Sequence, residues 1–310
     1  MIAHVRSDDG GESRTPAPEL APKRAPALPD VVLLGATGNL SQKYLWQVLF
    51  ELWSEDKIGR VIGAAVEEAT IGAALVQDII RKKVKVQAGT SSSSVDAACR
   101  LEGFRRQVEY VQLRDEEQYA ALGASLNGGA DASSSPSTVV PPRLFFCAVP
   151  PSCYPLIARR INAHARPAAG AKAAGAWLRV VFEKPFGRDS ASARALSEAL
   201  RTQLEEEEVY RIDHYLGKEA VQAIGGFRRA NPALEAIWDR RHIASVEVVM
   251  KEVETCEGRT GYYDDYGVVR DVLQNHLIEV MALVAADLPA ASGAAAAVAL
   301  PARVATSTRP

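Results

Sequence analysis

No apolar run in this sequence is long enough to cross a bilayer, and the amino terminus lacks the continuous hydrophobic core of a signal peptide. Acidic residues near the amino terminus also argue against a transit peptide. A net charge of -2 over 310 residues gives no reason to expect a nucleic-acid or membrane partner. These absences predict a cytoplasmic protein.

Cysteine is scarce, and the four residues present do not have the spacing of metal ligands. We therefore predict reduced thiols and no bound metal. The remaining composition, with 47% hydrophobic and 24% charged residues, is typical of a soluble globular protein. The length suggests two domains. The cysteines are Cys99, Cys147, Cys153 and Cys256.

Short apolar runs alternate with helical patterns through the first two thirds of the chain. Strands of a parallel sheet are buried on both faces, so they are expected to be apolar throughout. Such alternation predicts an α/β fold, a Rossmann-type doubly wound parallel sheet that binds ligands at the carboxyl ends of its strands. The expected strands cover residues 30–34, 60–66, 108–111, 144–149 and 178–182.

A glycine-containing turn directly follows the first expected strand, and a helical pattern begins after it at Ser41. Strand, glycine turn and helix form the context that a dinucleotide site requires, because glycines let the backbone approach the pyrophosphate. The spacing is G-x-x-G rather than G-x-G-x-x-G, so a tight structural turn explains the pattern about as well. The turn consists of Gly35, Ala36, Thr37, Gly38, Asn39 and Leu40.

The second expected strand ends at the position where a Rossmann domain meets the adenosine ribose of its cofactor. A carboxylate there suits a free 2′-hydroxyl, whereas an arginine suits a 2′-phosphate. This sequence has Val66, Glu67 and Glu68 at that position. The two carboxylates would repel a 2′-phosphate.

The stretch from Tyr210 to Glu219 concentrates an imidazole, an ammonium group, a guanidinium, two phenols and two carboxylates in ten residues. Polar groups this dense are costly to bury unless they pair with each other or with a ligand. Imidazole, ammonium and phenol together form a donor set suited to a phosphate ester. A solvated turn between helices explains the composition equally well.

His276 lies within a predicted helix over residues 271–285, on the same apolar side as Val272 and Val280. A lone histidine in a core is usually a hydrogen-bonded structural residue. The alternative is a general base whose pKa is tuned by burial and by a carboxylate partner.

The last third of the chain changes character. Residues 244–252 alternate apolar and polar side chains, which predicts an antiparallel strand with one covered face and the beginning of an α+β antiparallel-sheet domain. We expect a disordered arm over 1–29, a dinucleotide-binding Rossmann domain over 30–209, a partial α+β substrate domain over 210–285 and a low-complexity tail over 286–310.

Five motifs, in this order and at compatible spacing, resemble those of the glucose-6-phosphate dehydrogenase family. Together they cover roughly residues 30–285, and the run from Arg211 is very specific to that family. They are the turn from Gly35 to Leu40, Ala148 to Pro151, Glu183 to Gly187, Arg211 to Glu219, and Arg270 to Leu277.

The resemblance implies oxidation of glucose 6-phosphate at C1 to 6-phosphogluconolactone, the first step of the pentose phosphate pathway, with hydride transfer to NADP. It also implies a role for each matching residue. His276 is then the catalytic base, Asp213 orients it, and Lys218 lies near the reacting end. The implied substrate ligands are Lys184, His214, Tyr215, Lys218, Glu252 and Asp271, and the implied cofactor ligands are Gly35, Ala36, Thr37, Gly38, Asn39, Leu40, Pro150 and Lys184.

Three positions depart from the family pattern, and two of them bear on the cofactor. Asn39 replaces an aspartate, Tyr44 replaces a basic residue, and Val66 replaces the arginine that holds the 2′-phosphate of NADP. NADP remains the expectation from the family, with NAD as the alternative because Val66 replaces that arginine.

Members of this family continue well beyond the helix of His276, whereas an alanine-rich tail stands at that point here. We therefore expect a truncated product with little activity, for which the family's homo-oligomer is doubtful. Two alternatives stay open. One is a non-catalytic nucleotide-binding remnant of the same family, and the other is a different sugar oxidoreductase of the same general fold.

Overall fold

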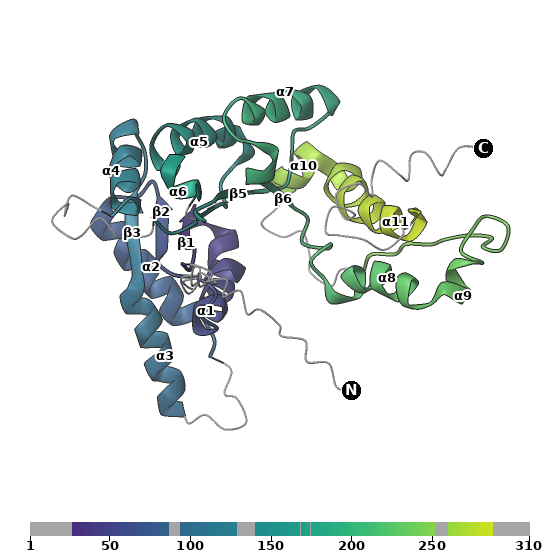
Figure 1. The fold of residues 1–310 in the computed structure, drawn as a ribbon, viewed down its shortest axis with the longest axis horizontal. Coiled ribbons are helices and arrows are strands. Elements are labelled where there is room, and N and C mark those ends of the chain that lie inside the picture. The colour runs from purple at the N-terminus through teal and green to yellow at the C-terminus, as the bar shows by residue number, and fades with distance from the viewer. Residues whose placement is uncertain are drawn as a thin grey trace, which may run out of the picture.

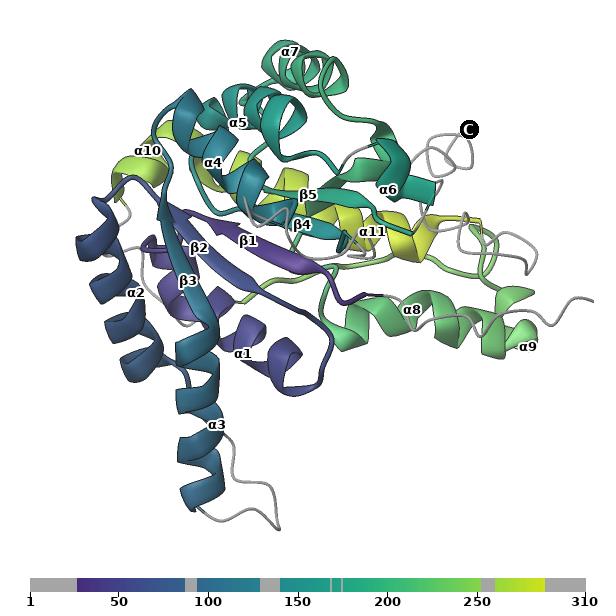
Figure 2. The ribbon, with the colours of Figure 1, turned by 60° about the vertical axis from the view of Figure 1, so that its left-hand side comes forward.

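The computed structural model describes residues 27–86, 94–128, 140–167, 169–173, 175–251 and 260–287. Within these ranges six parallel strands form one sheet in the order β3-β2-β1-β4-β5-β6, which confirms the doubly wound α/β fold (Figures 1 and 2). The strands are β1 (Asp30–Leu34), β2 (Val61–Ala65), β3 (Val108–Gln112), β4 (Arg143–Cys147), β5 (Leu178–Glu183) and β6 (Val209–Ile212).

Helices cover both faces of the sheet, and each face has its own apolar core (Figure 2). The central strand β1 feeds both cores, since Val31 and Leu33 pack on one side and Val32 and Leu34 on the other. One face carries α1 (Trp46–Ser54), α2 (Ala69–Lys83) and α3 (Ser94–Gln107); the other carries α4 (Glu116–Leu126), α5 (Tyr154–Arg160) and α7 (Ser190–Arg201).

Several shorter helical segments connect these elements. No helix in the described ranges is both long and apolar enough to cross a membrane. The segments are η1 (Ser41–Leu45), η2 (Pro151–Cys153), η3 (Ile161–Ala165), α6 (Ala169–Ala173) and η4 (Glu206–Glu208).

β6 is a short edge strand that the sequence pattern does not predict. Its four residues pair with β5 in parallel, although Tyr210 is exposed and Arg211 is charged. Edge strands are short and carry polar residues because one side faces no further strand, so their sequences lack the apolar signature of the central strands. The polar stretch from Tyr210 therefore begins in the sheet and continues into a turn.

Beyond β6 the described residues form helices and irregular segments, with no further strand (Figure 1). The antiparallel strand expected over residues 244–252 is not formed, because residues 244–251 carry no regular secondary structure. A strand requires a neighbour for its backbone groups, and none of the described residues supplies one. The helices here are α8 (Glu219–Ala230), α9 (Pro232–Glu235), α10 (Thr260–Val268), η5 (Val269–Leu277) and α11 (Ile278–Ala285).

Arg228 of α8 fastens the end of α11. Its guanidinium, 2% exposed, donates to the carbonyl oxygens of Val284 at 3.1 Å and Ala286 at 2.8 Å, and pairs with Glu235 at 2.6 Å. A cation at a helix carboxyl end satisfies free carbonyls and opposes the helix dipole. Since η5 continues directly into α11, this anchor also fixes the helix that carries His276.

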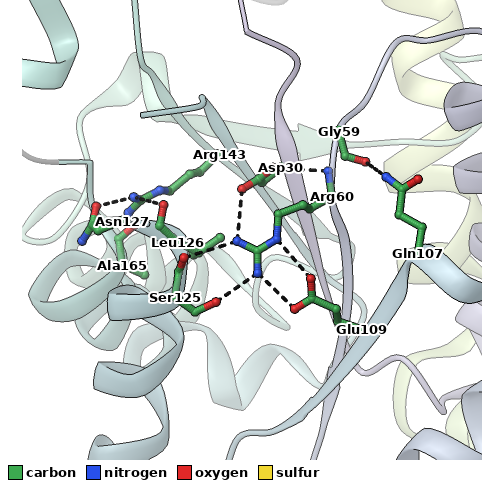
Figure 3. A network of polar contacts seen from close by, with 10 residues as sticks. All are labelled: Asp30, Gly59, Arg60, Gln107, Glu109, Ser125, Leu126, Asn127, Arg143 and Ala165. Carbon is green, nitrogen blue, oxygen red and sulfur yellow. Dashed lines mark hydrogen bonds and ion pairs between the residues drawn. The ribbon is translucent and has the colours of Figure 1, made fainter. Parts of the chain in front are cut away.

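A polar network closes the amino ends of the strands (Figure 3). Arg60 bonds the Glu109 carboxylate at 3.0 Å and the Ser125 hydroxyl at 3.0 Å, and lies 3.9 Å from the Asp30 carboxylate. The fully buried Arg143 donates to the carbonyl oxygens of Leu126 at 3.0 Å and Ala165 at 2.7 Å. It therefore caps the carboxyl ends of α4 and η3 from the start of β4.

Candidate active site

The chemistry-bearing residues gather where β5 and β6 end. Lys184 directly follows β5, and Asp213 directly follows β6, so the parallel pairing of these strands brings the two residues to the same edge of the sheet. A turn then carries the chain from Asp213 to Lys218, and α8 begins at the next residue. The dense polar stretch is thus held against the sheet on one side and a helix on the other.

His276 reaches this edge from η5 and forms a close pair with Asp213. Nδ1 of the imidazole lies 2.6 Å from Oδ1 of the carboxylate, across 63 residues of sequence. The same oxygen accepts the backbone N–H of Tyr215 at 2.8 Å. His276 is only 2% exposed, so the pair lies away from bulk water and the imidazole is held in one orientation.

The carboxylate partner fixes which ring nitrogen of His276 carries the proton. An ionised carboxylate can only accept hydrogen bonds, so Nδ1 of His276 is the donor to Asp213. Nε2 then keeps its lone pair and can accept a proton from a bound hydroxyl group. The arrangement is that of a general base oriented by a carboxylate, which also stabilises the imidazolium once it forms.

Aromatic rings and a lysine surround the imidazole. The Tyr215 ring stacks on the His276 ring with centroids 4.3 Å apart, and the His214 ring meets it edge-on at 4.6 Å. The Lys218 ammonium lies 3.7 Å from the centre of the Tyr215 ring, within the range of a cation–π contact. These contacts place three of the predicted substrate ligands beside the predicted base.

A second contact joins η5 to the end of β5. The Lys184 ammonium donates to the Asp271 carboxylate at 3.0 Å and to its backbone oxygen at 2.9 Å. Asp271 and His276 are five residues apart on one π-helical segment, so both can face the sheet edge. The sequence analysis predicted Lys184 and Asp271 as substrate ligands, and the structure brings them together as an ion pair.

Burial and neighbouring charges shift the pKa values of two groups in this cluster, His214 and Glu183. Burial lowers the pKa of His214, and the neighbouring charges of His276, Lys184 and Lys218 lower it further. Burial raises the pKa of Glu183, with Lys184 opposing this effect and Asp213 adding to it. The cluster therefore offers ammonium and imidazole donors suited to an anionic ligand, beside the carboxylates of Asp213 and Asp271.

Asp213, His214 and His276 also form the one group of candidate metal ligands in the described part of the chain, with donor atoms within 4.8 Å of one another. Asp213 Oδ1 is already bonded to His276 and to the Tyr215 backbone. Two nearby ammonium groups, on Lys184 and Lys218, oppose a further cation. The absence of a metal therefore stays a prediction.

The glycine turn follows β1 as expected. Gly35 has φ +80°, and a Cβ there would lie 2.3 Å from the carbonyl oxygen of Ala148, so only glycine fits. The turn is closed by the Gly38 N–H, which donates to the Gly35 oxygen at 2.9 Å. Residues 39–54 then run as one continuous helix, so Asn39 and Leu40 form its first turn. This is the strand, turn and helix geometry that cradles a pyrophosphate.

Two domain models of one enzyme family match the chain. "Glucose-6-phosphate dehydrogenase, NAD binding domain" matches residues 32–223, and "Glucose-6-phosphate dehydrogenase, C-terminal domain" matches residues 226–309. The first match alone covers more than half of the 310 residues.

The chain belongs to the glucose-6-phosphate dehydrogenase family. Its sheet with the glycine turn corresponds to the family's NAD-binding domain, so the cofactor is a nicotinamide dinucleotide. The resemblance drawn from the five motifs is confirmed.

Named relatives of this glucose-6-phosphate dehydrogenase family member include proteins from several compartments. The "GDH/6PGL endoplasmic bifunctional protein" of Homo sapiens is 42% identical over 262 residues, covering 84% of this chain and 32% of that protein. "Glucose-6-phosphate 1-dehydrogenase 5, cytoplasmic" of Arabidopsis thaliana is 35% identical over 274 residues, covering 84% of this chain and 49% of that protein.

A solved structure, "Glucose-6-phosphate dehydrogenase in complex with its substrate glucose-6-phosphate", has a TM-score of 0.73 at 30% identity, covering 86% of this chain and 54% of that one. The chain thus spans about a third of the Homo sapiens relative and about half of the other two proteins.

The structure of this family member brings most predicted site residues into two groups. One group contains Lys184, Asp213, His214, Tyr215, Lys218, Asp271 and His276. The other contains Gly35, Ala36, Thr37, Gly38, Asn39 and Leu40, with Pro150 at the carboxyl end of the neighbouring β4. The predicted ligand Glu252 lies outside the described residues.

Arg114 is a candidate residue that the sequence analysis missed. It follows β3, and its Nε donates to the carbonyl oxygen of Val66 at the end of β2, at 2.5 Å. β3 pairs directly with β2, so any residue just past β3 lies beside the ribose end of the cofactor site in a glucose-6-phosphate dehydrogenase domain. Pairing the second and third expected strands in parallel would have placed Arg114 next to Val66 before the structure was known.

Proposed function

We propose that this chain binds glucose 6-phosphate beside a nicotinamide dinucleotide and oxidises the sugar at C1 to 6-phosphogluconolactone. The observation that carries the proposal is the 2.6 Å contact between buried His276 and Asp213 at the carboxyl edge of the sheet. This edge is where a doubly wound sheet binds its ligands. A structural relative solved with glucose 6-phosphate supports the choice of substrate.

In the proposed reaction His276 is the general base. Its Nε2 takes the proton of the C1 hydroxyl group, while Nδ1–H stays bonded to Asp213, which stabilises the imidazolium. The electron pair of the C1–H bond leaves as hydride, and the O–H pair becomes the carbonyl of the lactone. When bound, the nicotinamide supplies the acceptor for this hydride.

The remaining residues bind and orient the substrate in this proposal. His214, Tyr215 and Lys218 are donors suited to the phosphate, and Lys218 also lies near the reacting end. Asp271 accepts a sugar hydroxyl, as does Glu252, which is outside the described residues. Lys184 contacts both substrate and cofactor, and in doing so it exchanges its bond with Asp271 for bonds to ligands.

The glycine turn holds the cofactor through its backbone, with Pro150 and Lys184 at neighbouring strand ends. NADP is the expectation carried over from the family, and NAD is the alternative; the ribose end of the site is considered below. The proposal includes domain limits at 30–209 and 210–285, a cytoplasmic location and a place at the first step of the pentose phosphate pathway. The family's homo-oligomer stays doubtful for this chain.

The test is to follow reduced cofactor and lactone when the chain meets glucose 6-phosphate. We expect His276→Asn to lower kcat about 10²- to 10⁴-fold, the usual contribution of a positioned base. His242→Asn is the matched control, because exposed His242 makes a similar Nδ1 contact with Asp239 at 2.9 Å. It should leave kcat unchanged.

Equal losses in both variants would contradict the assignment of the base. Binding of a dinucleotide without any lactone formation would instead select a non-catalytic nucleotide-binding module. Turnover of another sugar phosphate in preference to glucose 6-phosphate would select a different sugar oxidoreductase.

A further inference from the structure

The end of β2 carries two adjacent carboxylates beside the glycine turn. β2 pairs with β1 in parallel, so residues just past β2 lie next to the turn that follows β1 (Figure 2). In a doubly wound dinucleotide domain this is the position that meets the adenosine ribose. The side chains at this point therefore decide whether a free 2′-hydroxyl or a 2′-phosphate fits.

The two carboxylates have different tasks. Glu68 is the N-cap of α2 and accepts the backbone N–H groups of Thr70 at 3.1 Å and Ile71 at 3.3 Å. Glu67 instead faces the glycine turn, where its Oε1 accepts the Thr37 hydroxyl at 2.8 Å. Glu68 is committed to its helix, and Glu67 is tied to the turn that meets the cofactor.

Glu67 also keeps acceptor capacity. Its Oε2 is buried and has no hydrogen-bond partner among the described residues. An unpaired buried oxygen is costly, and the terminal torsion of a glutamate is broad, so the carboxylate can turn toward a hydroxyl donor. A ribose 2′-hydroxyl is such a donor, whereas the dianionic form of a 2′-phosphate has acceptor oxygens and negative charge only.

The backbone of Glu67 is held firmly. The Tyr110 hydroxyl donates to the Glu67 carbonyl oxygen at 3.0 Å. Tyr110 packs on α2 at Gly72, where a Cβ would lie 2.0 Å from the ring, so the tyrosine has room only because that residue is glycine. Burial, followed by the Glu67 charge, raises the pKa of Tyr110 to about 12.

The positive charge at this end of the site is limited. Val66 is 59% exposed and offers no donor for a phosphate. Arg114 is the nearby cation, and its Nε is already bonded to the Val66 carbonyl oxygen. The negative charge of Glu67 alone balances this cation.

We infer that Glu67 selects the cofactor at its adenosine ribose, accepting a free 2′-hydroxyl and repelling a 2′-phosphate, so that this chain takes NAD in preference to NADP. The inference rests on the proposed function for the presence of the dinucleotide and adds the choice between its two forms. It assigns the discrimination to Glu67 rather than to Glu68.

The test measures equilibrium binding of NADH and NADPH through their fluorescence, without substrate or turnover. We expect NADH to bind the unaltered chain at least about tenfold more tightly than NADPH. Repulsion between a carboxylate and a phosphate ~4 Å apart near a protein surface costs at least the free energy of a tenfold change in affinity. Glu67→Gln should reduce the ratio to near unity. Val66→Arg combined with Glu67→Gln should reverse it.

Glu68→Gln is the matched control. It removes the same charge from the next residue, whose side chain caps a helix. It should leave the ratio of NADH to NADPH affinity within about twofold of the unaltered chain, while lowering the melting temperature because the helix cap is weakened.

Tighter binding of NADPH by the unaltered chain, or an unchanged ratio in Glu67→Gln, would overturn the inference while the proposed function stands. If Arg114→Gln abolished tight NADPH binding, the ribose end would belong to Arg114. Binding of neither cofactor would overturn the proposed function itself.

Discussion

The two ends of the sheet both carry buried charges, yet they are built differently. At the amino ends, Asp30, Arg60 and Arg143 come from the starts of neighbouring strands, and the two arginines bond to nearby helix ends (Figure 3). At the carboxyl ends, Asp213 pairs with His276, which arrives from a helix 63 residues later in the chain. One cluster is internal to the sheet domain, and the other depends on a second part of the molecule.

This difference separates stability from chemistry. Burial raises the pKa of Asp30 and lowers that of Arg143, so both charges are held at a cost that their mutual attraction offsets only in part. Arg143 donates to carbonyl oxygens that would otherwise be free, which completes the fold. The His276 pair leaves one ring nitrogen able to accept a proton, which is a requirement of catalysis and not of folding.

The largest expected effect is at Asp213, where a substitution should lower activity without lowering stability. In Asp213→Asn the amide can donate to Nδ1 of His276, which favours the tautomer whose Nε2 carries the proton and cannot act as a base. We expect kcat to fall about 10²- to 10⁴-fold while the melting temperature changes little. Nitrogen NMR of the imidazole should report the change of tautomer. Full turnover with the tautomer reversed would show that the pair is structural.

The opposite result is expected at the amino ends. Arg143→Met leaves the carbonyl oxygens of Leu126 and Ala165 without their donor and Asp30 without a buried countercharge. We expect the free energy of unfolding in urea to fall by about 3 kcal/mol. Exposed Arg201, paired with Glu198, is the control, and Arg201→Met should cost no more than about 0.5 kcal/mol. A small loss at Arg143 would mean that the network contributes little to stability.

The smallest expected effect concerns pH and His214. Its pKa is lowered in the folded state, so between that value and the ordinary 6.5 the unfolded chain binds more protons than the folded one. Stability should therefore fall as the pH drops below about 6.5, and His214→Asn should flatten this part of the profile. Thermal melts from pH 7.5 to pH 5 would measure it. An identical profile in the variant would assign the titration to another group.

The sequence predicted the central strands well because their burial on both faces leaves an apolar signature, as in β1. It did not predict β6, whose exposed edge permits Tyr210 and Arg211. It also predicted an antiparallel strand over 244–252 that is absent from residues 244–251, since alternation marks a half-buried strand only when a neighbour exists to pair with it.

At the candidate active site, the sequence identified the reactive groups but did not decide between a structural and a catalytic role for them. His276 on an apolar helix face was more typical of a structural histidine than of a base, and the stretch from Tyr210 was equally consistent with a solvated turn. The contact with Asp213 removes that ambiguity, and so does the stacking of Tyr215 on the imidazole. Likewise, only the bonds of Glu67 and Glu68 distinguish a cofactor-facing carboxylate from a helix cap.

By itself, then, the chain determined its local elements, the glycine turn and the set of reactive side chains, because these follow from backbone sterics and from the periodic burial of apolar residues. Tertiary structure decided which charges became neighbours. Hydrogen bonds and pKa values depend on distances of a few ångströms between residues far apart in sequence, and those distances exist only once the sheet and the helix of His276 have packed together.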